Sequence, residues 1–282
     1  MEKVLANRWN RKRITKKAHA GRGLKTIREM PVQMENLIKM KSNKLILCFA
    51  CIMTIVACHA QTSPSSPPGN PSMFAAVKAE KAADISDLLA SGADVNGVDA
   101  QGDTPLIMAC CYGYQDIVEA LLAATNIDVN AKGEFGLTAL MNASADGYGE
   151  IVKILIVHGA DVNIKDDNGE TALFDVKKDG IVEFLIAHGA DVNAMNKKGE
   201  TPIFLASVGT GDSATKDVVE SLIAHGANVN VRNNNGDTPL SEATSDDIIN
   251  LLISHGADPN AKNNDGLTPE QQRKESQSSI GF

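Results

Sequence analysis

The stretch LIAHGADVN, residues 185–193, decides the fold because it recurs along the chain. Close copies end at Asn163, Asn230 and Asn260, and looser copies, LLASGADVN and LLAATNIDVN, end at Asn96 and Asn130. A segment that returns every 30 to 37 residues predicts an array of similar units, stacked one on the next, in place of a single globular core.

The residues between two copies carry the signals of a helix pair. A threonine stands where the first helix should begin, because its hydroxyl can accept from the free N–H groups of a helix end. Apolar residues at helical spacing, such as Ile151, Val152 and Leu155, predict the second helix, and a left-handed glycine should end it. The positions concerned are Thr104, Thr138, Thr171, Thr201, Thr238 and Thr268, the prolines Pro105, Pro202, Pro239 and Pro269 that follow four of them, and the terminating Gly159, Gly189, Gly226 and Gly256.

This pattern resembles the ankyrin repeat, in which a turn, Gly-x-Thr-Pro-Leu, a short helix, a second helix and Gly-Ala-Asp-Val-Asn follow in order. The resemblance covers residues 72–275 and recurs in register. It implies an all-α repeat fold, an ankyrin α-solenoid of stacked helix-turn-helix units joined by β-hairpin turns. The units are an N-terminal cap, five repeats and a partial C-terminal cap. Fraying is expected at this end, because Glu270 replaces an expected leucine and a disordered tail, residues 276–282, is predicted to follow.

The repeats differ in length. From one motif asparagine to the next the steps are 34, 33, 30, 37 and 30 residues. The alignment places a loss of three residues between the two helices of repeats three and five. It places a gain of four in repeat four, which predicts an edge loop over residues 207–216. Loops of this kind often bind partners.

The histidine of the motif is interpreted as part of the fold and not of a site. His158, His188, His225 and His255 each precede a terminating glycine, where a donor or a cation is favoured by the helix end. Stacked helices lie about 8–10 Å apart, whereas two ligands of one zinc ion lie within about 4 Å of each other. The histidine column is therefore not expected to bind metal.

The start of the chain differs in charge from the rest. Residues 1–44 carry 13 Lys/Arg and 3 Asp/Glu, a net charge of +10, and residues 45–282 carry 14 and 32, a net charge of −18. An acidic body repels phosphate backbones, so nucleic-acid binding by the repeats is not expected. Residues 1–39 form a basic leader that is superfluous if translation begins at Met40.

A charge-free apolar run of 13 residues, 45–57, follows the leader. It is shorter than the roughly 20 residues of a membrane span and fits the core of a signal peptide over residues 40–60. The end of the run, Ile-Val-Ala-Cys at residues 55–58, resembles the lipobox of bacterial lipoproteins, which implies cleavage before Cys58 and lipidation of its thiol. Cleavage after Ala60 and an uncleaved anchor are the alternatives. Residues 61–71 read as a Ser/Pro-rich tether.

The ankyrin resemblance implies a protein-binding module and not an enzyme, with no cofactor. The export signal places the expected protein partner at the periplasmic side of a bacterial membrane, where the chain would act as a monomer. Two alternatives are a host-directed effector and a cytoplasmic or nuclear adaptor. The partner's identity does not follow from the sequence.

In ankyrin arrays partners contact the hairpin tips and the first helices. Carried over to this chain, that face is mostly polar with two aromatic anchors, Tyr112 and Phe135, although Phe135 can instead pack on a neighbouring hairpin. The residue after each turn glycine, such as Asp103, Glu170 or Asp237, is expected to be free of the core. The predicted partner-binding residues are Tyr112, Glu134, Phe135, Asp167, Asn168, Lys197, Lys198, Asn234 and Asn235.

Overall fold

The computed structural model describes residues 71–208 and 213–278. The predicted leader, the signal peptide with Cys58 and nearly all of the tether lie outside these residues. In the described part of the chain no helix is both long enough and apolar enough to cross a membrane.

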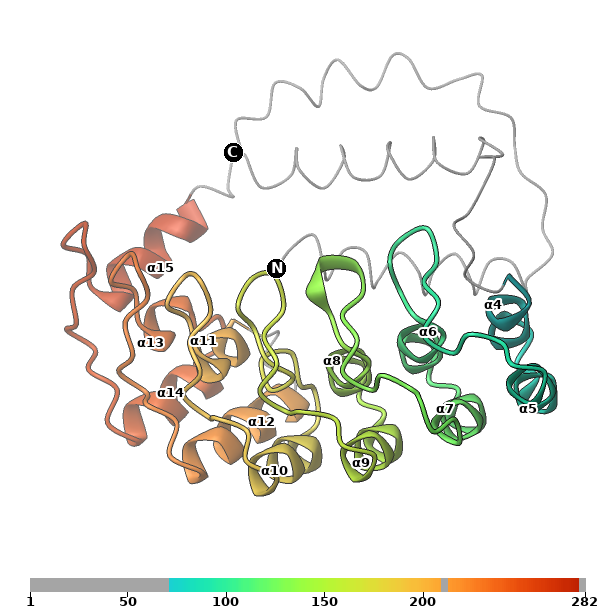
Figure 1. Ribbon diagram of the computed structural model, residues 1–282. Helices are drawn as coiled ribbons and strands as arrows, with labels where there is room; N and C mark the ends of the chain where they lie inside the picture. Colours follow the sequence, from blue (N-terminus) through green and yellow to red (C-terminus); the bar gives the residue numbers. More distant parts are fainter. Residues whose placement is uncertain (1–70, 209–212, 279–282) are drawn as a thin grey trace, which may run out of the picture. The chain divides into compact units, whose positions relative to one another are not determined.

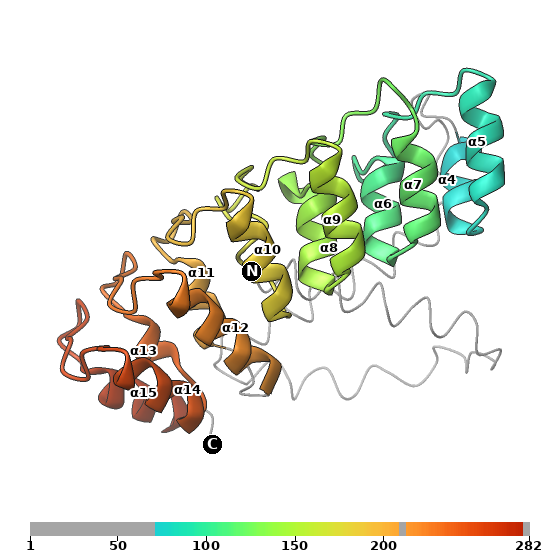
Figure 2. The same ribbon diagram turned by 90° about the horizontal axis from the view of Figure 1, so that it is seen from below.

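The described residues form a linear stack of helix pairs (Figures 1 and 2). First helices lie in one layer, second helices lie in another, and the hairpins project beyond the first helices. The N-terminal cap is α4 (Pro71–Lys78) and α5 (Ala82–Ala90). Repeats one and two contain α6 (Pro105–Tyr112), α7 (Gln115–Leu122), η1 (Glu134–Gly136), α8 (Ala139–Asp146) and α9 (Gly149–Val157). The later units contain α10 (Asp179–Ala187), α11 (Pro202–Ser207), α12 (Ser213–Ala224), α13 (Pro239–Glu242), α14 (Asp246–Ser254) and α15 (Pro269–Ser278).

One hydrophobic core runs through the stack from Met73 to Ala257. In the second helix of repeat two the predicted apolar face is buried, with Ile151, Val152 and Leu155 at 2% exposure or less. Because each unit buries this face against its neighbours, the array and not the single repeat is the stable object.

The helix-start threonines cap as predicted in repeats one and two. The Thr104 hydroxyl accepts from the backbone N–H of Ile107, and Thr138 accepts from Met141, both at 3.3 Å. Thr201 and Thr238 also precede helices, but within the described part of the chain their buried hydroxyls have no hydrogen-bond partner. In place of the hydroxyl bond, Ser241 Oγ accepts from the backbone N–H of Thr238 at 3.0 Å.

The prediction that repeats three and five are shortened between their helices is wrong. The shortening falls on the first helix: in repeat three it is reduced to a turn over residues 172–175, and in repeat five α13 has 4 residues against 8 in α6. The second helix must keep its buried face, such as Val182 and Leu185, in line with the neighbouring repeats. The first helix therefore absorbs the lost length.

Two further boundaries differ from the sequence prediction. In repeat four the expected edge loop is partly helical, because α11 ends at Ser207 and α12 already begins at Ser213. At the C-terminus α15 continues to Ser278, past the predicted limit of 275. Polar bonds hold this cap: Thr268 and Gln271 bond reciprocally at the start of α15, and Gln272 donates to Glu242 at 3.0 Å.

The histidines have the structural position that the sequence predicts. Nδ1 of His158, His188 and His225 lies 2.8 Å from the carbonyl oxygen four residues earlier, and in His255 the distance is 2.9 Å. The glycine after each histidine has a φ of +85 to +88°. The histidine ring thus adds a second hydrogen bond to a carbonyl of the last helical turn, which already accepts from the backbone N–H of the same histidine.

The asparagine that closes each motif joins one repeat to the next. The Asn193 side chain donates to the carbonyl of Gly226 at 3.1 Å and accepts from the backbone N–H of Asn228 at 2.9 Å. An equivalent pair of bonds runs from each of Asn96, Asn130, Asn163 and Asn230 to the following unit. This asparagine ladder fixes the spacing of the repeats on the side of the second helices.

Candidate functional site: the hairpin tips

Most hairpin tips are built around the first residue of the turn. In repeat one, Asp99 Oδ1 accepts from the backbone N–H groups of Gln101 and Asp103 at 2.9 and 3.0 Å. A side-chain acceptor of this kind holds the turn without using up the backbone carbonyls. The same two bonds recur at Asp166, Asn196, Asn233 and Asn263.

Neighbouring tips are also bonded to each other through their backbones. The N–H of Lys197 donates to the carbonyl of Asn168 at 2.8 Å, and the N–H of Asn234 donates to Lys198 at 2.9 Å. Asp167 bonds in the same way to Phe135, and Asn264 to Asn235, each at 3.0 Å. The tips therefore present their side chains from a backbone held in register, which reduces the entropy that a partner must overcome on binding.

The predicted partner-binding residues lie on this row and at the end of one first helix. Phe135 and Glu134 are half-buried on η1, and Asn168 and Tyr112 are also half-buried. The side chains of Asp167, Lys197, Lys198, Asn234 and Asn235 are exposed.

The expectation that the residue after the turn glycine is free of the core is wrong at three tips. Asp103 is 4% exposed, Asp237 is 6% and Glu170 is 7%. Each of these carboxylates accepts a hydrogen bond from the next repeat, Asp103 from the N–H of Glu134 at 2.9 Å. The position is therefore a joint between repeats and not part of the partner-binding surface.

Repeat two has a different tip. Gly133 replaces the Asp or Asn that holds the other turns, and a Cβ at Gly133 would lie 2.2 Å from Asp103 Oδ1. The glycine thus leaves room for the Asp103 carboxylate to reach this tip.

Phe135, at the apex of the same tip, has a φ of +59°, a left-handed conformation that a bulky side chain rarely adopts. Strain of this kind often marks a functional position.

Tyr112 belongs to a separate aromatic cluster. Its ring stacks on Tyr114 with the centroids 5.4 Å apart, and the Tyr148 hydroxyl donates to the Tyr112 carbonyl at 3.4 Å. Burial, followed by a hydrogen bond with Glu80, raises the pKa of Tyr114 to about 12. The two predicted anchors are therefore parts of two features. The sequence analysis missed both: Tyr114 lies two residues from Tyr112 in the turn between α6 and α7, and Tyr148 comes from the equivalent turn of the next repeat.

The joint between repeats three and four holds two carboxylates on one amide. Asn196 Nδ2 donates to Glu170 Oε1 and to Glu200 Oε2, each at 3.0 Å. Asp166 and Asp175 also lie near Glu170. Burial, which is the largest cause, and the nearby Asp175 and Asp166 raise the pKa of the Glu170 carboxyl to about 7, against the opposing effect of the hydrogen bond from Asn196.

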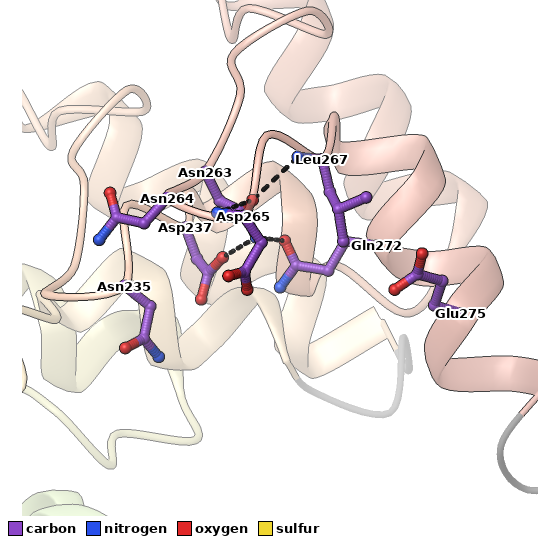
Figure 3. Close-up of a pocket in the computed structure, with 8 residues that line it drawn as sticks. All are labelled: Asn235, Asp237, Asn263, Asn264, Asp265, Leu267, Gln272 and Glu275. Carbon is purple, nitrogen blue, oxygen red and sulfur yellow. Dashed lines mark hydrogen bonds between the residues drawn. The ribbon is translucent and has the colours of Figure 1, made fainter.

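The corresponding joint at the C-terminal end has one carboxylate and one amide as acceptors (Figure 3). Asn263 Nδ2 donates to Asp237 Oδ1 at 2.9 Å and to Gln272 Oε1 at 3.3 Å. The joint borders a pocket of about 270 Å³ that is lined by Asn235, Asp237, Asn263, Asn264, Asp265, Leu267, Gln272 and Glu275. Within residues 71–208 and 213–278 no three acidic, histidine or cysteine side chains are placed to hold a metal ion.

Comparisons with known proteins agree with the repeat geometry. The family model for ankyrin repeats in three copies matches residues 44–133 and 174–263, and a model for many copies matches residues 121–173. The crystal structure of the ankyrin repeat domain of Bcl-3, a unique member of the IκB protein family, is similar to this chain at 26% identity and a TM-score of 0.57. That match covers 72% of this chain and 92% of the Bcl-3 chain. No curated protein matches the sequence.

Proposed function

Because this chain belongs to the ankyrin repeat family, a family of non-catalytic binding domains, we propose that it captures a partner protein on its hairpin tips. The observation that carries the proposal is the row of tips whose backbones are bonded to one another while their side chains face outward. A surface that is ordered before binding loses little entropy when a partner docks. Phe135, held in a strained conformation at one apex, is the proposed anchor.

The capture experiment compares four tagged proteins for retention of a partner from the native source: wild type, Phe135→Gly, Tyr112→Ala and Phe135→Gly with Tyr112→Ala. Glycine adopts the left-handed conformation without strain, so Phe135→Gly should keep the fold within about 1 kcal/mol while removing the ring. We expect Phe135→Gly to reduce capture at least tenfold, because aromatic hot spots contribute 2 kcal/mol or more.

Glu183→Gln is the matched control, because Glu183 is exposed on α10 in the layer of second helices and away from the tips. A folded double variant that captures the partner at wild-type affinity would contradict the anchor. Residues 207–216 in repeat four would then be tested next.

We further propose that the array acts after export, as a lipid-anchored protein on the periplasmic side of a bacterial membrane. The support is the order of the N-terminal sequence: a charged start, an apolar run, and Cys58 followed by a Ser/Pro-rich stretch. Mass spectrometry of the native protein should find a lipid-modified N-terminus at Cys58. Peptides from residues 1–39 in the mature protein would refute this.

A further inference from the structure

The row of second helices ends at α14 without the neighbour that the earlier second helices have. In Figure 1 this row contains α5, α7, α9, α10, α12 and α14. The last helix, α15, stacks in the other layer, against α13, and it contains no apolar side chain beyond Pro269. A sixth unit therefore begins with its first helix, and the described residues contain no second helix for it.

The exposed side chains of α14 mark the missing neighbour. Ile253 is 43% exposed, whereas Leu122, at the same position of α7, is 6% exposed. Ile249 lies one helical turn before Ile253, on the same face of α14, and is half-buried. The residue equivalent to Ile249 is at most 1% exposed in the four preceding second helices: Val118, Val152, Val182 and Val219. The apolar face formed by Ile249 and Ile253, here called the open face, is thus partly exposed to solvent.

The asparagine ladder is open at the same end. Each motif asparagine from Asn96 to Asn230 bonds through its side chain to the following unit. Asn260 is exposed, and its backbone N–H donates to Asp258 Oδ1, but its side chain makes no hydrogen bond in the described part of the chain. An apolar and a polar feature thus both lack the unit that would follow α14.

The chain continues from the end of α15 with apolar residues. Residues 279–282, Ser-Ile-Gly-Phe, lie outside the described residues. They contain Ile280 and Phe282, whereas the stretch from Glu270 to Ser279 has no apolar side chain. Four residues span up to about 14 Å, which exceeds the roughly 8–10 Å between the axes of packed helices. These residues are therefore long enough to reach from the end of α15 to the neighbouring layer.

The spacing of Phe282 agrees with the repeat. It stands thirteen residues after Pro269, the first residue of α15, and the same spacing separates Pro105, the first residue of α6, from Val118. Val118 is fully buried in the row of second helices. Phe282 thus has the register of the residue by which a second helix contributes to this core.

We propose that residues 279–282 turn back from α15 and cover the open face of α14, with the Phe282 ring against Ile249 and Ile253. The segment stands in for the missing second helix and closes the hydrophobic core at the C-terminal end. The driving force is the removal of apolar surface from water on both the ring and the isoleucines. The proposal does not depend on partner capture at the hairpin tips.

The direct test is a nuclear Overhauser measurement on the full chain, between the Phe282 ring and the methyl groups of Ile249 and Ile253. We expect these contacts to be observed and to arise within one chain. An isotope-filtered spectrum of mixed labelled and unlabelled chains, which detects contacts between molecules, should therefore show none. Absence of the contacts would overturn the proposal, and their appearance in the filtered spectrum would overturn it in favour of a second copy on the open face.

A double-mutant cycle tests the same contact through the amide hydrogen-exchange protection of α14. Phe282→Ser should lower this protection about tenfold. Ile253→Ser should lower it as well, and the two effects should not add, because each variant removes the same contact. Additive effects, or wild-type protection of α14 in Phe282→Ser, would overturn the proposal and leave the open face to a partner.

The matched control is Val157→Ser, since Val157 is 79% exposed on α9 and lies far along the row from α14. It should leave the protection of α14 at the wild-type value, and in combination with Phe282→Ser its effect should be additive. Coupling between Val157 and Phe282 as strong as that between Ile253 and Phe282 would show a general effect of apolar loss and would contradict a specific contact.

Discussion

The joint between the tips of repeats three and four and the joint at the C-terminal cap share one hydrogen bond but differ in the group beside it. In both, an asparagine Nδ2 donates to a carboxylate of the preceding tip. Asn196 donates to Glu170 at 3.0 Å, and Asn263 donates to Asp237 at 2.9 Å. The second acceptor differs: it is the Glu200 carboxylate in the interior and the neutral Gln272 amide at the cap. The interior asparagine therefore joins two carboxylates, whereas the cap asparagine joins one carboxylate and one neutral amide.

The comparison shows that equivalent positions of the repeat motif can have different hydrogen-bond acceptors and different nearby charges in different repeats. The interior joint lies beside the turn that replaces the first helix of repeat three, where Asp175 adds a further carboxylate. The cap joint lies beside α15, whose Gln272 completes it. The charge of the interior joint thus comes from its own tip, through Glu200, and from the neighbouring turn, through Asp175, whereas the cap joint is completed by α15.

The largest expected difference comes from replacing the bridging asparagines. Asn196→Asp removes both donors and adds a charge among Glu170, Glu200 and Asp166, which should lower the free energy of unfolding by about 3 kcal/mol at pH 8. Asn263→Asp loses a hydrogen bond to one carboxylate, Asp237, in a more open setting, and should cost about 1 kcal/mol. Urea unfolding of both variants measures the difference, and equal costs would contradict the charge argument.

The Asn196→Asp penalty should also shrink at low pH. As the carboxyl groups are protonated, the repulsion disappears and a donor returns to the joint. Unfolding curves at pH 5 and pH 8 distinguish this from simple loss of packing, which would give the same penalty at both pH values.

A smaller effect is expected at the helix ends. Gly189 has a φ of +88° and open space around it, so Gly189→Val introduces backbone strain alone, about 2 kcal/mol. His188→Gln removes the Nδ1 bond to the Phe184 carbonyl and the ring contact with Phe184, and should cost less than about 1 kcal/mol because the site is exposed. Thermal melting checks both. Equal losses, or wild-type melting that shifts with zinc, would refute the structural role of the histidine.

The smallest expected difference is in the asparagine ladder. Asn193→Ala removes two bonds between repeats three and four, and Asn230→Ala removes two equivalent bonds between repeats four and five. Both should lower stability by about 1 kcal/mol, because the exposed groups left behind can bond to water. Urea midpoints that differ between the two variants would show that the joints also differ on the side of the second helices.

The repeat motif predicted the fold because its signals are local. A threonine hydroxyl caps N–H groups three residues away, proline tolerates the first helical position, and glycine adopts a positive φ wherever the chain places it. Gly189 and Thr104 behave as predicted for this reason. The histidine column was interpreted correctly on the same basis, since Nδ1 of His188 binds a carbonyl four residues earlier in its own helix.

The sequence by itself determined the array, its register, the helix-end caps and the family. Only the tertiary structure decided that repeat three takes its shortening in the first helix, that Tyr148 of the next repeat bonds to Tyr112, and that Glu170 is buried beside Asn196. The first set depends on contacts within a few residues of one helix or turn. The second depends on contacts between repeats, where residues about thirty positions apart meet across a joint and the charge, burial and length of one unit are set by its neighbour.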